Sequence, residues 1–480
     1  MLKHLIKAYW YVTGYIRKHG WKFLLAIVAG GVIFSIIVPR LMRRFSHRRS
    51  YYIGVVGEYN LDSLPLVVRQ QLSRSLVMSD SDGSFVPDLA DKMSIEKIDN
   101  SFRRYRFTLP EGIYWQDGKP LEATDINYRT KDANVTYDGL EIVYELPEVF
   151  ASFPQMLTAP LLRFERVKKW GMMDEIKVYG LSDVHLTSYK YLDDSHYALS
   201  QVVLDDVRSR ERFVYRFYYT QAQAIDAFKL GEVDYLFDVT NVEEIKNWEM
   251  TEVTERLVPD QYLAVFFNTS DPLMTRNMRQ ALSYAVEKER PGYQRAVGPI
   301  SEDSWAYFAE AKKYDKNIAS GVERLLDEMP GEPIELSLIT TSSFYDVASR
   351  IKEDWEELGE AAVEACQEDK EIKEKSACEY LRIKVQIQIQ TIPDTNNFQT
   401  MLVGQQVALD PDQYSLWHSD LATNFTHYKN TRVDNLLEKG RQTVDTQERL
   451  TLYQEFQQAL LEDPPAIFLW YMKSSDLARK

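Results

Sequence analysis

Apolar residues after residue 50 alternate between two spacings, and this alternation restricts the fold more than any other feature of the sequence. The segment 381–393 (LRIKVQIQIQTIP) places apolar residues at every second position, as in a half-buried strand. The segments 275–289 and 449–463 place them three and four residues apart, as in a helix that packs on a core. Because strand and helix patterns alternate over more than 400 residues, we predict α/β lobes.

Other segments sharpen this prediction. The run 466–471 (AIFLWY) is apolar on both faces, which is typical of a strand covered by helices on both sides. The pattern 221–230 predicts a helix that stops at Gly231, and 344–359 predicts a helix closed by its final glycine. The segment 360–380 is predicted to be a charge-dense helical insert whose side chains mostly face solvent.

The amino-terminal end reads as a membrane anchor. No residue from Phe23 to Pro39 is charged, so we predict a transmembrane helix over residues 21–40, preceded by a basic amphipathic segment over residues 1–20. A cleaved signal peptide is the alternative, but the apolar run is longer than usual and lacks a small-x-small exit. Five basic residues lie on each side of the run, so charge does not fix the orientation.

The rest of the chain is acidic. Residues 1–50 hold ten Lys or Arg and no acid, so the net charge of −15 leaves −25 for residues 51–480 once this +10 is removed. An acidic body repels phosphate backbones, and we therefore expect no nucleic-acid partner.

Cys366 and Cys378 are the only cysteines, and they flank the charged insert. A disulfide between them would stabilise the fold by ~3 kcal/mol and would suit an oxidising, extracytoplasmic compartment. Two free thiols are the other possibility.

The sequence holds no motif that predicts catalysis. Glycine-rich phosphate loops, a nucleophile elbow and a zinc-binding HExxH helix are all absent, so we expect no enzyme, no cofactor and no metal. In 409–420 (LDPDQYSLWHSD), Asp410 and Asp412 stand two residues apart, and on an extended chain they would point to opposite sides. A hydrolase that uses this pair is therefore the weakest hypothesis, and Asp410 before Pro411 is better read as a turn former.

Four stretches in collinear order resemble one family. They are 86–128, in which Asp117, Gly118, Pro120, Ala123 and Asp125 follow a D-G-x-P-x-x-A-x-D pattern, 224–236 (AIDAFKLGEVDYL), 266–289 (FFNTSDPLMTRNMRQALSYAVEKE) and 430–471. Together they are similar to the extracytoplasmic solute-binding proteins of ABC importers for oligopeptides, dipeptides and nickel chelates (solute-binding family 5).

The resemblance implies a two-lobed periplasmic-binding-protein-like fold of type II, with an extra subdomain, behind the transmembrane helix. Two crossing strands, 264–270 and 464–471, would form the hinge. The implied ranges are 51–85, 165–263 and 464–480 for lobe I, 86–164 for the extra subdomain, and 264–463 for lobe II.

It also implies a receptor on the outer side of the cell membrane that binds an oligopeptide-like solute between its lobes and delivers it unaltered to an ABC permease. Aromatic side chains suit such a cleft because they offer flat, amphipathic surface at low entropic cost. The expected ligand-binding residues are Tyr59, Trp115, Trp305, Asp410, Asp412, Tyr414, Trp417 and His418.

One departure keeps a second function open. Peptide-binding members use an aspartate to hold the free amino group of the peptide, and this position is Val407 here. The alternative is a membrane-tethered envelope interaction or assembly protein that kept the fold and lost solute uptake.

Overall fold

The computed structural model describes residues 49–480 except for 81–82, 99–100, 129, 170–172, 194–196, 373 and 409, together with residues 10, 13, 14, 17, 18, 20 and 21. Residues 22–48, which hold nearly all of the predicted transmembrane helix, lie outside the described part. Among the residues that are described, no helix has the length and apolar character needed to cross a membrane.

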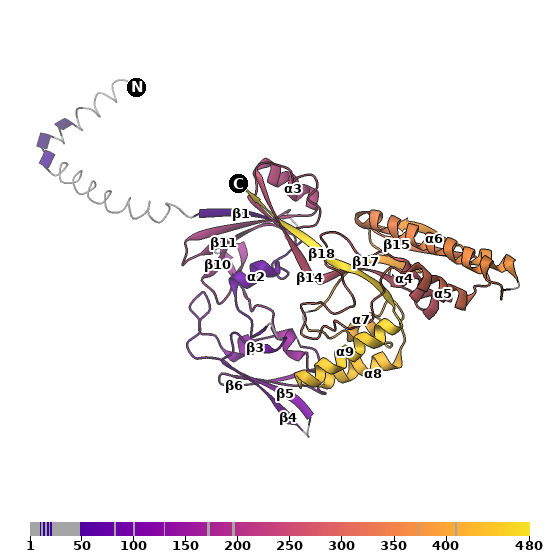
Figure 1. The fold of residues 1–480 in the computed structure, drawn as a ribbon. Helices are drawn as coiled ribbons and strands as arrows, with labels where there is room; N and C mark the ends of the chain where they lie inside the picture. The colour runs from indigo at the N-terminus through magenta and orange to yellow at the C-terminus, as the bar shows by residue number, and fades with distance from the viewer. Residues whose placement is uncertain are drawn as a thin grey trace.

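One ten-stranded sheet runs through both lobes (Figure 1), in the order β10-β11-β12-β1-β13-β18-β14-β17-β15-β16. Its strands are β1 (Arg49–Val56), β10 (Val184–Tyr191), β11 (Leu199–Asp206), β12 (Glu211–Tyr218), β13 (Tyr235–Val239), β14 (Thr251–Phe267), β15 (Ile334–Thr340), β16 (Ile383–Ile389), β17 (Thr400–Gln406) and β18 (Ala466–Arg479). The lobe I half is therefore completed by a strand from the far end of the sequence.

In lobe I, β1 lies parallel to both β12 and β13. The helix α2 (Leu66–Leu72) packs with the core that holds Ile53 and Tyr215, while α3 (Gln221–Leu230) packs with a separate core around Phe228. The α3 pattern predicted the helix well, because the Thr220 hydroxyl caps its start and Gly231 ends it with a left-handed φ of 79°.

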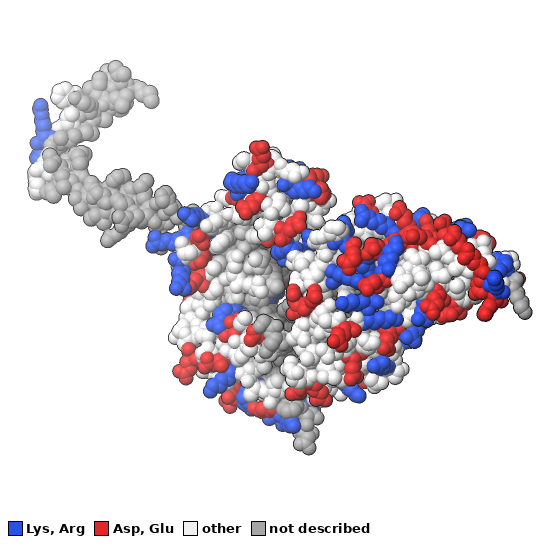
Figure 2. All heavy atoms as spheres, in the orientation of Figure 1, with Lys and Arg blue, Asp and Glu red and all other residues white. Residues whose placement is uncertain are grey.

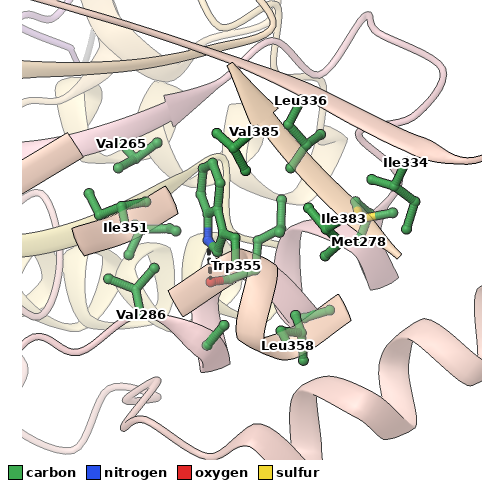
Figure 3. Packing of buried hydrophobic residues seen from close by; sticks show 14 of the residues in the cluster. Val265, Met278, Val286, Ile334, Leu336, Ile351, Trp355, Leu358, Ile383 and Val385 are labelled. Carbon is green, nitrogen blue, oxygen red and sulfur yellow. Dashed lines mark hydrogen bonds between the residues drawn. The ribbon is translucent and has the colours of Figure 1, made fainter. Parts of the chain in front are cut away.

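Lobe II sandwiches its sheet between two helical layers. Alternate residues of β14 serve the two faces: Val265 packs with α4 (Arg276–Ala285), α5 (Ile318–Glu328) and α6 (Tyr345–Glu368), whereas Phe266 packs with α8 (Thr431–Gln442) and α9 (Thr446–Glu462). At the centre of the first core Trp355 is fully buried, and its indole nitrogen donates to the Leu282 carbonyl at 3.1 Å (Figure 3).

The helix α6 corrects one prediction. It continues through Gly359, which was expected to close it, and ends at Glu368. Gly359 has a different role, because a Cβ there would collide with the backbone of Ile383 in β16. Cys366 at the end of α6 and Cys378 in the short helix η4 (Lys375–Leu381) form a disulfide, with their Cα atoms 5.6 Å apart. Acidic side chains line the α6 region of the surface (Figure 2).

The extra subdomain has a core of its own around Tyr105, Phe107 and Trp115. Its main sheet has the order β4-β5-β7-β6. The four strands are β4 (Lys92–Ile98), β5 (Ser101–Thr108), β6 (Asn134–Asp138) and β7 (Glu141–Glu145). The shorter elements of the same half of the chain are β2 (Val77–Ser79), β3 (Phe85–Pro87), η1 (Ala123–Asp125), η2 (Phe153–Leu157), β8 (Arg163–Lys169) and β9 (Met173–Tyr179). Lobe II contains two more short helices, η3 (Ser342–Phe344) and α7 (Tyr414–Trp417). The residue ranges predicted for the lobes and the subdomain remain predictions.

The strands β14 and β18 run across both lobes side by side (Figure 1). Val258 pairs with Met472 and Tyr262 pairs with Tyr471, so residues 259–261 of β14 have no partner on β18. Pro259 also lacks a backbone N–H to donate. The pairing of β14 with β18 is interrupted here, although Gln261 still pairs with Gln406 of β17, and we call residues 259–261 the hinge bulge.

Candidate ligand-binding cleft

The strands of the two lobes run toward each other, so the loops that follow them lie between the lobes. Because β13 and β14 are both antiparallel to β18, they run the same way, from lobe I toward lobe II. The strand β17 is antiparallel to β14, and β15 is parallel to β17, so both run back toward lobe I. The carboxyl ends of parallel strands are where open α/β sheets bind ligands. Here those ends face each other across the hinge bulge.

A small cavity lies beside the hinge bulge. Its volume is ≈ 100 Å³, and it is formed by three segments: Pro259 and Asp260 of the bulge, the loop 299–304, and the loop 407–413. Both lobe II loops were expected to line the cleft. Ligand pockets usually measure roughly 300–1,000 Å³, so the space beside the hinge is small in this conformation.

Asp410 does not face this cavity. Its carboxylate is fully buried and receives two hydrogen bonds from Arg449, at 2.7 and 3.0 Å. It also accepts from the Asp412 backbone N–H at 3.0 Å, which is the turn contact expected of an aspartate before proline. Burial opposes the charge on Arg449, but Asp410 beside it raises the pKa of that guanidinium above its ordinary value.

The extra subdomain is bonded to lobe II through this ion pair. The Ser152 hydroxyl donates to Asp410 at 2.9 Å and accepts from Arg449 at 2.7 Å. Next to it, the Ala151 N–H donates to the Arg441 carbonyl at 2.7 Å. We call residues 150–152 together with Asp410, Arg441 and Arg449 the latch. In Figure 1 the helices α8 and α9 reach the subdomain that holds β4 and β5.

Asp412, the second of the two aspartates that flank Pro411, has a different partner. Asp412 accepts from Arg441 Nε at 2.7 Å, and burial raises the pKa of its carboxyl although Arg441 opposes that shift. The Arg441 guanidinium lies between two rings, 4.0 Å from that of Tyr414 and 5.1 Å from that of Phe150. The Tyr414 ring in turn stacks on His418 at 4.2 Å.

Two predicted wall residues are core residues instead. Trp417 is fully buried between Phe266 and Phe468 in lobe II. Trp115 is 2% exposed in the subdomain core, where its indole N–H donates to Asp125 at 2.9 Å. Neither ring reaches a solvent-facing surface of the cleft, so the expectation that they contact ligand in this conformation is corrected.

Tyr59 and Trp305, two further aromatic residues of the predicted set, belong to different lobes. Tyr59 follows β1 in lobe I, packs on Phe217 at 5.1 Å, and donates to the Val56 carbonyl. Trp305 in lobe II is partly buried, packs against Tyr453, and contacts Gly83 of the loop between β2 and β3. The structure thus gathers Asp410, Asp412, Tyr414, His418 and Trp305 around the latch, and it places Tyr59 and Trp115 elsewhere.

Sequence reasoning missed the basic residues of the latch. Arg449 lies on α9 in line with Tyr453, Phe456 and Leu460, which are buried at helical spacing. A charged residue within an apolar stripe indicates a buried partner, and this signal was present in the sequence. Ser152 offered no comparable signal. In the described part of the chain no three His, Cys, Asp or Glu side chains are grouped as metal ligands.

Known proteins of the same architecture place this geometry in context. No protein-family model matches the chain. It is 20% identical over 504 residues to the oligopeptide-binding protein AppA of Bacillus subtilis, an alignment that covers 87% of this chain and 85% of AppA. NikZ from Campylobacter jejuni in complex with Ni(L-His) matches with a TM-score of 0.67 at 20% identity, over 90% of this chain and 94% of NikZ. The chain has the fold of a two-lobed solute-binding protein.

A third comparison agrees. The structure of AppA from B. subtilis in complex with a nonapeptide matches with a TM-score of 0.62 at 17% identity, over 90% of this chain and 95% of AppA. The resemblance seen in the sequence is therefore confirmed over nearly the whole chain, and so is the α/β two-lobed fold that it implied. AppA is described as a binding protein and NikZ holds Ni(L-His), which agrees with the expectation that the chain is a binding protein and not an enzyme.

Proposed function

We propose that this chain is a membrane-anchored extracytoplasmic receptor that binds an oligopeptide-like solute between its lobes and passes it to an ABC permease. The observation that carries the proposal is the pair of lobes joined by β14 and β18, whose strand ends face each other across the hinge bulge. Rotation at residues 259–261 would open and close the space between them. Closure needs only a ligand that binds the closed form better than the open form.

The anchor is the uncharged run within residues 21–40, with basic residues on both sides. The disulfide between Cys366 and Cys378 supports placement of the body outside the cytoplasm, because such bonds persist in oxidising compartments. Protease treatment of intact cells tests this topology. Digestion of the 51–480 body is expected, and a body protected from protease would contradict it.

The ligand class rests on the relatives. AppA is described as oligopeptide-binding and was solved with a nonapeptide, while NikZ holds Ni(L-His). The ≈ 100 Å³ cavity is too small for several residues of peptide. Binding of such a ligand therefore requires lobe II to separate from the subdomain, with the latch broken or rearranged. The ligand-binding residues that we propose for this open space are Tyr59, Trp305, Tyr414 and His418.

Native mass spectrometry of the protein purified from its host tests the proposal. Peptides that leave together with the protein on gentle activation are the expected result. Thermal shift measurements with peptide pools and with a nickel–histidine complex extend the test. Protein that carries no solute and responds to neither class of ligand would refute solute reception.

A second function is favoured by the latch itself. Buried, fully hydrogen-bonded contacts between the subdomain and lobe II would suit a protein whose cleft stays shut. In that case the chain is a membrane-tethered envelope interaction or assembly protein. An empty protein whose lobes keep one distance in every condition, and which co-purifies with envelope proteins after cross-linking, would support this function over solute uptake.

A further inference from the structure

Lys288, just after the end of α4 in lobe II, is a buried lysine without an ionic partner. It is only 4% exposed, and its Nζ donates to the Ser283 carbonyl at 2.6 Å and to the Val286 carbonyl at 2.8 Å. Within the described part of the chain, no carboxylate forms an ion pair with it and no acceptor meets its third N–H. Lysine is almost never fully buried unless an opposite charge pairs with it. Lys288 therefore lacks both a counter-charge and its third hydrogen bond.

The charged residues around a small cavity beside Lys288 are all basic. Lys288 lines this cavity together with Arg295 and Lys313, and its other lining residues are uncharged. The cavity lies between the end of α4 and the start of β18, and its volume is ≈ 10 Å³. We call it the lysine cavity. It takes one small species, because a single water molecule needs about 10–15 Å³ of such space.

Arg295 supplies an independent observation. Its Nε is buried, and no described residue accepts a hydrogen bond from it. The carboxylates that neutralise Arg295 bind elsewhere on the guanidinium, since Asp315 and Glu289 both meet Nη1. A buried donor that belongs to a charged group costs free energy when it is left unsatisfied. Because Arg295 lines the lysine cavity, a species inside the cavity is available to accept from Nε.

We propose that the lysine cavity binds a compact monovalent anion of the halide class, chloride in the first instance, held by the third N–H of Lys288 and by Nε–H of Arg295. A halide ion accepts hydrogen bonds from both donors and supplies the counter-charge that Lys288 lacks. A water molecule could accept the same bonds, but it would leave the buried ammonium uncompensated. Sulfate, phosphate and carboxylates are too large for the volume.

A bound anion would also fix the charge state of Lys288. Burial and the like charge of Arg295 lower the pKa of Lys288 to about 7, while Glu287, Asp315 and Asp354 oppose that shift from outside the cavity. Negative charge inside the cavity would raise the pKa again and keep the ammonium protonated at neutral pH. The competing state is a neutral amine beside water, which needs no anion. Neither state depends on whether the protein receives a solute.

Chloride titration of the purified full chain tests the proposal. Melting temperatures are compared in sodium chloride and in sodium gluconate at equal concentrations, because gluconate is too large for the cavity. The line width of the chloride NMR signal reports bound ion directly. Lys288→Met removes the ammonium, and Arg295→Lys keeps the charge but removes Nε–H. Lys429→Met is the matched control, because Lys429 is an exposed lysine of lobe II outside the cavity. Circular dichroism confirms that each variant is folded.

In the unaltered protein and in Lys429→Met, chloride should broaden the NMR signal and raise the melting temperature by about 1–2 °C above its value in gluconate. Lys288→Met should lose both responses. Arg295→Lys should bind chloride at least about tenfold more weakly, because it lacks one hydrogen bond to a charged group. Equal responses in Lys288→Met and Lys429→Met, or no response in the unaltered protein, would overturn the site. Unchanged affinity in Arg295→Lys would overturn the role given to Nε.

Discussion

Loss of the Ser152 hydroxyl should release the subdomain from lobe II without exposing a charge. In Ser152→Ala, Asp410 keeps both of its bonds from Arg449, and Arg449 keeps Asp410 and the Tyr453 hydroxyl. The contacts that disappear are the two hydrogen bonds through which Ser152 crosses from the subdomain to lobe II. The variant therefore weakens the latch while the ion pair beneath it remains complete.

The size of the effect follows from those two bonds. A hydrogen bond to a charged group contributes about 1.5–3 kcal/mol. Because the charged partners still satisfy each other after the change, we take a net loss of about 2 kcal/mol for the closed state, which shifts an open-to-closed equilibrium by about 30-fold.

Single-molecule energy transfer can measure that shift. Cys366 and Cys378 are bonded, so dyes attach only to cysteines introduced at the exposed positions Asp138 in the subdomain and Glu323 in lobe II. We expect a long-distance population to grow in Ser152→Ala. Ser283→Ala is the control, because this buried hydroxyl donates to Arg279 within lobe II and crosses no interface. An unchanged distance distribution in the folded variant would refute the latch.

Three further predictions concern stability. Arg449→Met should lower the free energy of unfolding by about 3–5 kcal/mol, because it leaves the Asp410 carboxylate buried without its partner, and adding Asp410→Leu should recover most of the loss in urea denaturation. Reduction of the Cys366–Cys378 disulfide should lower the free energy of unfolding by about 3 kcal/mol, and a reductant should therefore lower the melting temperature. In the control variant with Cys366→Ser and Cys378→Ser, the reductant should not change the melting temperature. Burial lowers the pKa of Lys288 to about 7, below the ordinary value near ~10.4, so between these values the unfolded chain binds more protons. The free energy of unfolding should accordingly rise with pH across that range, by up to ~1.4 kcal/mol per unit, and Lys288→Met should flatten the rise.

The sequence predicted elements well where periodicity and a cap agree. The helix α3 is the clear case, because its pattern, its Thr220 cap and Gly231 all point to the same ends. Gly359 misled the analysis of α6, since glycine can end a helix or permit close packing, and only the approach of β16 distinguishes the two roles.

The candidate site was predicted less well. Trp115 and Trp417 have the composition of a ligand wall, but local sequence does not reveal whether an aromatic ring faces solvent or a core. Asp410 was recognised as a turn former, while its ion pair with Arg449 depends on a contact 39 residues away along the chain. Ser152 joins them from 258 residues away, and no local pattern encodes a contact of that range.

The position of β18 has a consequence for how the molecule is made. This strand comes after all the others in the sequence, yet it lies between β13 and β14 in the middle of the sheet. As the nascent chain leaves the ribosome, amino end first, it can form local hairpins and helices. Neither lobe can complete its sheet until residues 466–479 have also left the ribosome. Contacts of such long sequence separation form slowly. The polypeptide should therefore stay incompletely folded and in need of chaperones throughout its synthesis, and a product truncated before β18 should be degraded instead of accumulating.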